Sequence, residues 1–203
     1  DFYGATELGW VTLVNGEEMV ERPRTVGRPI AGQNIRILDE RGEVLKTGET
    51  GTVYVKNDQT MSGYLNDAEA TDQTKRDGWM SVDDTGWLDE DGYLYLSGRK
   101  RDMAIVGGMN VYPMEIEECL AKHEFVLEVA VVGVADDELG ERLIAVVVVR
   151  NRDAFNADTL IQHAREQLSA YKVPKRVEIV DQLPRNPTGK VLKQRLREQF
   201  ASR

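Results

Sequence analysis

The first half of the chain is built from short apolar segments separated by turn residues. Within a segment the side chains are apolar at alternate positions, or are β-branched and aromatic, which is typical of half-buried strands. Clusters of Asp, Glu and Gly between the segments indicate tight turns. The predicted elements are strands over 33–38 and 51–56, a hairpin over 87–96 about the turn 89–92, and a polar helix over 67–75 with Asp67 as N-cap. Such closely spaced strands predict a small β-barrel or a layered sheet.

From residue 103 onward the apolar runs are longer. The run Leu143–Val149 is apolar throughout, rich in β-branched residues and bounded by arginines, which predicts a buried strand. The charged residues 135–140 in front of it predict a loop. The predicted strands of this half are 103–106, 129–134, 143–149 and 176–180.

Three helices are predicted between and after these strands, from apolar positions that recur at helical spacing. Pro113 suits the first turn of the first helix. The apolar positions are Ile116, Cys119 and Leu120 in the first helix, Leu160, Ala164 and Leu168 in the second, and Leu192, Leu196 and Phe200 in the third. Strands and helices in this order predict a compact α+β unit. We place the boundary between the two halves in the charged segment Gly98–Asp102.

Composition narrows the class of protein. The chain has 203 residues, of which 41% are hydrophobic and 30% charged, as in an ordinary globular protein. Its net charge of −9 opposes binding to nucleic acid, which needs a basic surface. No apolar run approaches the roughly 20 residues of a transmembrane helix. The single cysteine, Cys119, excludes an internal disulfide and fits a reducing compartment, so we expect a cytoplasmic protein. His123 and His163 lack ligand-like spacing, so no structural metal is expected.

Five short motifs occur in order along the chain. They are Tyr3-Gly4-Ala5-Thr6-Glu7, Gly48-Glu49-Thr50-Gly51 with Gly63-Tyr64, Asp84-Thr85-Gly86, Gly98-Arg99 through Glu117, and Pro184-Arg185-Asn186-Pro187-Thr188-Gly189-Lys190. Together they resemble the acyl-CoA synthetase branch of the adenylate-forming superfamily, over essentially the whole chain. The resemblance implies a strand-rich C-terminal piece of the large adenylation domain over 1–98. It also implies a small, mobile α+β C-terminal domain over 99–203.

The resemblance implies nucleotide-binding roles for five residues of the first half. Tyr3 is expected beside adenine, Thr6 on the α-phosphate and Glu7 on Mg²⁺. Asp84 is expected to accept hydrogen bonds from both ribose hydroxyls, and Arg99 to lie near the ribose. The residue types suit these roles, because a hydroxyl can donate to phosphate, Mg²⁺ prefers carboxylate oxygen, and a carboxylate can accept from a vicinal diol.

Two positions depart from the family pattern. Val82-Asp83 stands before Asp84 where the family usually has Thr-Gly, so either aspartate can face the sugar. Arg101 stands where the family keeps its hinge residue, normally Asp or Lys. A hinge needs a polar, exposed residue that can change its backbone angles, and arginine meets that need.

Two further motifs are matched to the two steps of the family's chemistry. Gly107-Gly108 corresponds to one wall of the tunnel for the pantetheine arm of coenzyme A, where a missing β-carbon lets a slender chain pass. Lys190 corresponds to the catalytic lysine that reaches the acyl carboxylate and the α-phosphate of ATP. Thr188-Gly189-Lys190 is not a P-loop, because the first glycine and the final Ser/Thr of that motif are absent.

The function implied by the resemblance is that of an acid–CoA ligase. It would activate a carboxylic acid with ATP to acyl-AMP and then form the acyl-CoA thioester. A fatty acid is the family default, and an aromatic acid is equally admissible. The family's phosphate loop and most of its acyl pocket are not in this sequence, so we expect an upstream part of the same enzyme, without which the chain is inactive. Alternatives are a luciferase-like oxidase, a peptide-synthetase adenylation domain, or a module that binds coenzyme A or nucleotide without turnover.

Overall fold

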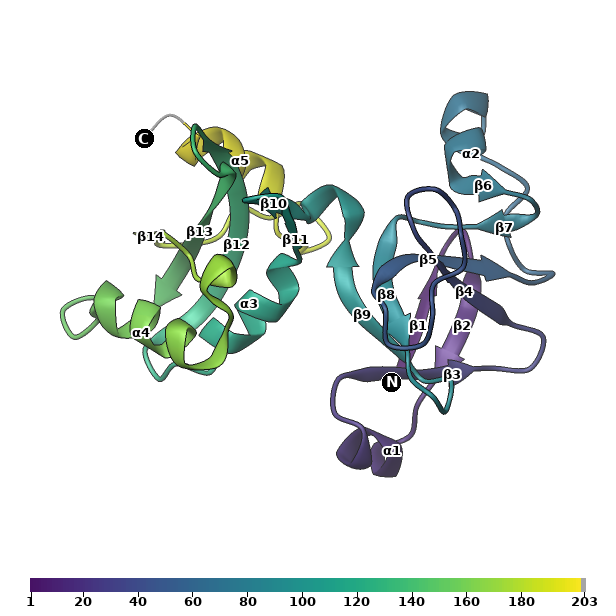
Figure 1. Cartoon of the computed structure of the whole chain (residues 1–203), viewed down its shortest axis with the longest axis horizontal. Coiled ribbons are helices and arrows are strands. Elements are labelled where there is room, and N and C mark those ends of the chain that lie inside the picture. The colour runs from purple at the N-terminus through teal and green to yellow at the C-terminus, as the bar shows by residue number, and fades with distance from the viewer. Residues whose placement is uncertain (202–203) are drawn as a thin grey trace. The chain divides into compact units, whose positions relative to one another are not determined.

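The computed structural model describes residues 1–201 and divides into two compact units, Asp1–Arg101 and Asp102–Arg203 (Figure 1). Both units mix strands and helices, which confirms the α+β prediction. The assignment of 1–98 and 99–203 to two functional domains, and the mobility of the second, stay predictions.

Unit 1 contains a nine-stranded sheet in which every pairing is antiparallel. The strand order is β1-β2-β3-β9-β8-β5-β7-β6, with β4 paired to β5. The strands are β1 (Phe2–Ala5), β2 (Gly9–Leu13), β3 (Thr25–Pro29), β4 (Asn34–Leu38), β5 (Gly51–Lys56), β6 (Lys75–Arg76), β7 (Trp79–Met80), β8 (Asp84–Leu88) and β9 (Leu94–Arg99). The helices are α1 (Gly16–Glu21) and α2 (Ala68–Thr74).

Local side-chain contacts explain where the two short helices of unit 1 begin. The predicted N-cap is confirmed, since Asp67 accepts a hydrogen bond from the Ala70 backbone N–H at 2.9 Å. Helix α1 was not predicted, because none of its residues is buried and it has no apolar face. A capping box starts it: Asn15 and Glu18 each accept the other's backbone N–H at 2.9 Å.

The β8–β9 hairpin is longer than the predicted 87–96 segment. It runs from Asp84 to Arg99, and these two residues are cross-strand partners at its open end. Strand β8 lies inside the sheet between β9 and β5. The hairpin therefore holds two predicted site residues side by side on adjacent strands.

Unit 2 contains a five-stranded sheet in the order β11-β10-β13-β12, with β14 parallel to β13. The strands are β10 (Ala104–Val106), β11 (Met109–Val111), β12 (Val126–Asp136), β13 (Gly140–Val149) and β14 (Arg176–Ile179). The helices are α3 (Pro113–Leu120), α4 (Ala157–Gln167) and α5 (Lys193–Phe200). Short 3₁₀ turns lie at η1 (Lys100–Asp102), across the boundary of the units, and at η2 (Ala170–Lys172).

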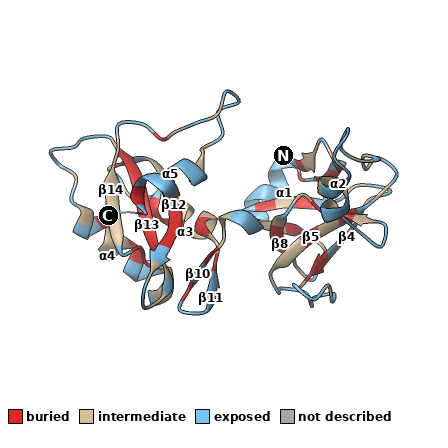
Figure 2. Ribbon diagram, turned by 90° about the horizontal axis from the view of Figure 1, so that it is seen from above, coloured by how far each residue is buried: buried red, intermediate tan, exposed pale blue. Residues whose placement is uncertain are grey.

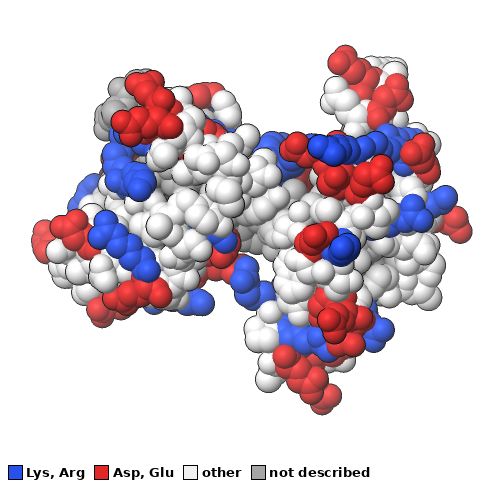
Figure 3. All heavy atoms as spheres, viewed as in Figure 1, with Lys and Arg blue, Asp and Glu red and all other residues white. Residues whose placement is uncertain are grey.

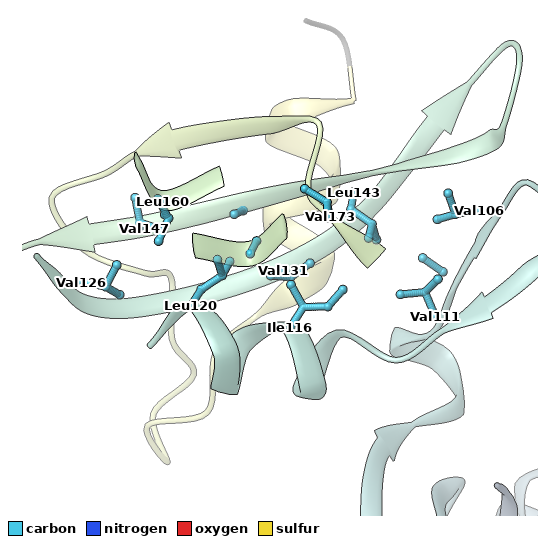
Figure 4. Close-up of a cluster of buried hydrophobic side chains, with 13 residues drawn as sticks. Val106, Val111, Ile116, Leu120, Val126, Val131, Leu143, Val147, Leu160 and Val173 are labelled. Carbon is cyan, nitrogen blue, oxygen red and sulfur yellow. The ribbon is translucent and has the colours of Figure 1, made fainter. Parts of the chain in front are cut away.

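Helices cover both faces of the β12–β13 ribbon. Odd-numbered residues such as Val131 and Val147 pack with α3 and α4 in one cluster, which includes Ile116, Leu120 and Leu160 (Figure 4). Even-numbered residues pack with Leu196 and Phe200 of α5 in a second cluster. Figure 2 shows the resulting buried stretch along both strands. Because both faces are buried, the two strands are apolar throughout rather than at alternate positions.

Two predictions for unit 2 need correction. The charged residues 135–140 do not form a loop of that length, because β12 continues to Asp136 and β13 starts at Gly140. Charged side chains are tolerated there because Asp137 and Glu138 are exposed and Asp136 is only partly buried, although Leu139 between β12 and β13 packs against the first cluster. Two apolar positions assigned to helices lie just outside them. Leu168 is the C-cap of α4, which ends at Gln167, although its side chain still packs against the first cluster. Leu192 is the N-cap of α5, which begins at Lys193.

The surface carries charges of both signs. On the face seen in Figure 3, acidic and basic side chains are interspersed. None of the described helices is long and apolar enough to cross a membrane.

Candidate functional site

The turn between β1 and β2 presents Thr6 and Glu7. The Leu8 backbone N–H donates to the Ala5 carbonyl at 3.1 Å, which closes a tight turn with Thr6 and Glu7 at its centre. Thr6 is exposed and Glu7 is half-buried. Both side chains are therefore available at the end of the hairpin.

A partner from another part of unit 1 orients Glu7. The Tyr64 hydroxyl donates to Glu7 Oε1 at 2.9 Å, and the Met61 backbone N–H donates to the Glu7 carbonyl at 2.9 Å. The carboxylate raises the pKa of Tyr64, since it favours the protonated donor. Sequence reasoning assigned no role to Tyr64, although Gly63-Tyr64 belonged to the motifs that were recognised.

Asp84 is the centre of a second cluster in unit 1. Its Oδ2 accepts a hydrogen bond from the Tyr3 hydroxyl at 2.9 Å, and its Oδ1 lies 3.3 Å from Arg99 Nε. The Asp84 side chain is only 13% exposed, whereas Arg99 is 38% exposed. Three strands separate β1 from β8 in the sheet order, so the sheet bends to bring Tyr3 to Asp84.

Burial dominates the electrostatics of this cluster. Desolvation raises the pKa of Asp84, although the hydrogen bond from Tyr3 and the charge of Arg99 act in the opposite direction. Desolvation also raises the pKa of Tyr3, and the Asp84 charge adds to that effect. Tyr3 is thus a neutral donor at neutral pH. A carboxylate offers about four acceptor sites, so each oxygen of Asp84 keeps capacity for one further donor.

The structure separates the two neighbouring aspartates. Asp83 is exposed and adopts a left-handed backbone conformation with φ of 62°. Its carbonyl accepts from the Lys100 backbone N–H at 2.8 Å. Asp84, rather than Asp83, is therefore the carboxylate in contact with Tyr3 and Arg99.

Tyr3 has little free surface. It is 7% exposed and belongs to the core of unit 1, together with Leu8, Val53 and Leu94. The part of Tyr3 with a polar contact is its hydroxyl, bound to Asp84. Its expected place beside adenine stays a prediction, and its hydroxyl orients the Asp84 carboxylate.

Gly107 and Gly108 form the two-residue turn between β10 and β11. Both have left-handed φ angles, 58° and 81°, and Val106 pairs with Met109 on either side. Such a turn favours glycine at both positions. A β-carbon on Gly108 would meet no heavy atom of the chain within 4 Å, so the space beside it is open. Arg101, the expected hinge residue, is exposed in η1 at the end of unit 1.

Lys190 lies at the end of an ordered loop that precedes α5. Its side chain is exposed, and no ion pair to it is found among residues 1–201. Its backbone N–H donates to Asn186 Oδ1 at 2.9 Å, and its carbonyl accepts the Asn186 N–H at 2.9 Å. The loop therefore presents a cation on a fixed backbone.

The side chains that could ligate a metal limit which metal the chain could hold. No group of three or more His, Cys, Asp or Glu suited to a metal occurs among the described residues. His123 and His163 do meet, edge to face with ring centroids 5.6 Å apart, although they are distant in sequence. A half-exposed carboxylate such as Glu7 fits Mg²⁺, which is commonly held by one or two carboxylates plus substrate phosphates.

The predicted residues fall into two sets, one in each unit. Tyr3, Thr6, Glu7, Asp84 and Arg99 belong to unit 1, and within it Tyr3, Asp84 and Arg99 are in direct contact. Gly107, Gly108 and Lys190 belong to unit 2. The roles assigned to these residues stay predictions.

Two family models match the chain. The model for AMP-binding enzymes matches residues 1–65, and the model for the C-terminal domain of AMP-binding enzymes matches residues 115–190. The two matches lie in unit 1 and unit 2, in that order.

Similar proteins and structures extend over nearly the whole chain. A long-chain-fatty-acid–CoA ligase of Yersinia pestis is 39% identical over 97% of the chain and 35% of its own length. The amide bond synthetase McbA of Marinactinospora thermotolerans superimposes with a TM-score of 0.91 at 37% identity, over 98% of this chain and 41% of McbA. The o-succinylbenzoate coenzyme A synthetase MenE of Bacillus subtilis, in complex with ATP and magnesium ion, superimposes with a TM-score of 0.90 at 32% identity. The superposition covers 97% of this chain and 40% of MenE. The chain thus spans well under half the length of these relatives.

Proposed function

Because the chain belongs to the AMP-binding, adenylate-forming enzymes, we propose that it is the part of an acid–CoA ligase that holds the nucleotide and provides the adenylating lysine. The observation that carries this proposal is the Tyr3–Asp84–Arg99 cluster. A nearly buried carboxylate with remaining acceptor capacity is suited to bind the two hydroxyls of a ribose.

The β1–β2 turn would contact the phosphates of ATP. Thr6 can donate its hydroxyl to the α-phosphate, and Glu7, oriented by Tyr64, can ligate Mg²⁺. A bound Mg²⁺ neutralises phosphate charge. The relative MenE, solved with ATP and magnesium ion, supports this use of the fold.

The first half-reaction depends on Lys190. A carboxylate oxygen of the acid attacks the α-phosphorus, the bond to the bridging oxygen breaks, and pyrophosphate leaves. Negative charge grows on the α-phosphate oxygens in the transition state. A cation on an ordered loop, with no ion pair of its own among the described residues, can stabilise that charge.

The second half-reaction depends on Gly107 and Gly108. The thiolate of coenzyme A attacks the acyl carbonyl, the bond to the phosphate oxygen breaks, and AMP leaves. The open space at Gly108 can admit the pantetheine arm. We propose that unit 2 rotates about Arg101 between the two steps, so that the Gly107–Gly108 turn replaces Lys190 at the reacting group.

The substrate proposal is a carboxylic acid, with a fatty acid as the first candidate. It is supported by the name of the Yersinia pestis relative. The name of McbA, an amide bond synthetase, suggests an amine as a second candidate acceptor. An amine in place of the thiol would give an amide from the same acyl-adenylate. We propose that the activity requires upstream residues corresponding to the rest of the longer relatives, and that the 203 residues alone are inactive.

The test is product analysis with the complete enzyme. It is incubated with ATP, Mg²⁺, coenzyme A and a panel of fatty and aromatic acids, and pyrophosphate and acyl products are measured. Acid-dependent pyrophosphate with acyl-CoA supports the proposal and identifies the acid. Pyrophosphate without acyl-CoA would favour a luciferase-like, peptide-synthetase or amide-forming enzyme. If no acid gives pyrophosphate, the remaining hypothesis is a module that binds coenzyme A or nucleotide without turnover.

A further inference from the structure

We propose that Asn186 is the positioning residue for Lys190, and that its side-chain oxygen fixes the backbone from which the Lys190 ammonium reaches the reacting phosphate. The inference rests on the proposed function of Lys190. It concerns a residue to which neither the motifs nor the comparisons gave a role.

The Asn186 side chain is the hub of its loop. Its Oδ1 accepts from the Thr188 N–H at 3.1 Å, the Thr188 hydroxyl at 2.8 Å and the Lys190 N–H at 2.9 Å. Its own backbone N–H and carbonyl bond the Lys190 carbonyl and the Gly189 N–H, each at 2.9 Å. Asn186 therefore holds Lys190 through both backbone polar groups of the lysine.

The loop is also attached to the sheet of unit 2. Arg185 donates to the Gly189 carbonyl at 2.6 Å and to Glu128 of β12 at 2.5 Å. Gly189 has a left-handed φ of 87°, which lets the chain turn back toward Asn186. Each end of the six-residue segment Arg185–Lys190 is thus tied down, while the Lys190 side chain extends into solvent.

This arrangement has a direct consequence for catalysis. A flexible lysine on a flexible loop loses both backbone and side-chain freedom when it meets the transition state. A lysine on a fixed loop loses only side-chain freedom, so more of its interaction energy lowers the barrier. Since Asn186 is far less suited than Lys190 to touch the phosphate itself, we class it as a positioning residue.

The test compares Asn186→Ala with Asn186→Asp in the complete enzyme. Aspartate keeps an acceptor oxygen at the same position, whereas alanine removes it. Misplacing a catalytic group by about 1 Å can cost roughly 100-fold, so we expect Asn186→Ala to slow adenylation by ~10- to 100-fold. Adenylation is followed by ATP–pyrophosphate exchange. Transfer from supplied acyl-adenylate to coenzyme A is measured separately and should change little.

Thr188→Val is the matched control within the loop. It removes one hydroxyl donor and leaves both bonds between Asn186 and Lys190, so adenylation should change by no more than about threefold, in line with the loss of one exposed hydrogen bond. Asn186→Asp should retain most of the wild-type exchange rate. If Asn186→Asp restores the exchange rate and Asn186→Ala does not, the effect comes from positioning Lys190 rather than from a general loss of stability.

A second readout does not require activity. Backbone ¹⁵N relaxation in the complete enzyme should show residues 188–190 as rigid in the wild type and in Asn186→Asp, and mobile on the nanosecond timescale in Asn186→Ala. The inference is overturned if these residues are equally rigid in Asn186→Ala, if exchange in that variant equals wild type, or if both half-reactions fall together. Absence of exchange in the wild type would refute the proposed function instead, and relaxation would still decide whether Asn186 orders the loop.

Discussion

The Asp84 carboxylate is held in the candidate site at a cost to the stability of the folded chain. Its carboxylate is nearly buried, and desolvation raises its pKa even though Tyr3 and Arg99 are in contact with it. A raised pKa means that folding favours the protonated acid over the ionised one, compared with the unfolded chain. Ionised Asp84, the form suited to a ribose, therefore contributes less to the stability of the fold than protonated Asp84 does.

The sign of the pH dependence follows from this shift. Between the ordinary pKa of 3.8 and the raised value in the folded state, the folded chain binds more protons than the unfolded chain. The contribution of Asp84 to the free energy of unfolding is therefore greatest at low pH, and it falls as pH rises through that interval. Above the interval the loss is complete and constant.

Asp84→Asn is expected to separate stability from function. The amide carries no charge to desolvate, so the variant should gain in Tm relative to wild type as pH rises above 3.8 and keep that gain at neutral pH. AMP binding by the complete enzyme should weaken by roughly 10- to 100-fold, as expected when hydrogen bonds lose a charged partner. Thermal melting at several pH values and titration with AMP measure the two effects. A lower Tm at neutral pH, or unchanged affinity for AMP, would contradict this reading.

The sequence alone predicts some features of the candidate site but not others. Asp84, Arg99 and Lys190 could be proposed as site residues because each lies in a motif that resembles a known family. The Tyr3–Asp84 bond joins residues 81 positions apart, and Tyr64–Glu7 joins residues 57 apart. No local spacing encodes such contacts, because they depend on how the sheet bends. The Asn186 loop is local and could have been found from the preference of Asn for turns.

The elements were predictable where burial is complete. Strands β12 and β13 are apolar at successive positions because α3 and α4 cover one face and α5 the other. Strands β1, β2 and β3 were missed because they are short and partly exposed, and because each contains a glycine, with a proline as well in Thr25–Pro29. Helix α1 has no buried residue, so only its capping box could have revealed it.

Helix α5 provides a test of the second cluster in unit 2. Leu196 is fully buried against β12 and β13, so Leu196→Ala should lower the free energy of unfolding of unit 2 by about 2–5 kcal/mol. Arg195→Ala, one position earlier on the exposed side, should change it by about 0.5 kcal/mol or less. Urea unfolding followed by circular dichroism measures both. Equal effects of the two substitutions would show that α5 does not pack on the sheet as described.

At the scale of the whole molecule, the proposed chemistry is divided between the two units. The residues that we propose to bind the nucleotide belong to unit 1, whereas Lys190 and the Gly107–Gly108 turn belong to unit 2. The family and its order of motifs could be predicted from the sequence. The acid could not, because acyl specificity depends on a pocket that these motifs do not form. In such an enzyme the two half-reactions should depend on different residues of unit 2.

The most direct test measures the two half-reactions separately in the complete enzyme carrying Lys190→Ala or Gly108→Leu. Gly92→Leu is the matched control, since Gly92 and Gly108 both have φ of 81° and neither has a heavy atom within 4 Å of an added β-carbon. Lys190→Ala should slow adenylation by ~100- to 1,000-fold, the cost of removing a transition-state donor, and leave transfer from acyl-adenylate nearly unchanged. Gly108→Leu should show the reverse, and Gly92→Leu should affect neither step selectively. If Lys190→Ala slows both half-reactions equally, or Gly108→Leu behaves like its control, the assignment of the two steps to these residues is wrong.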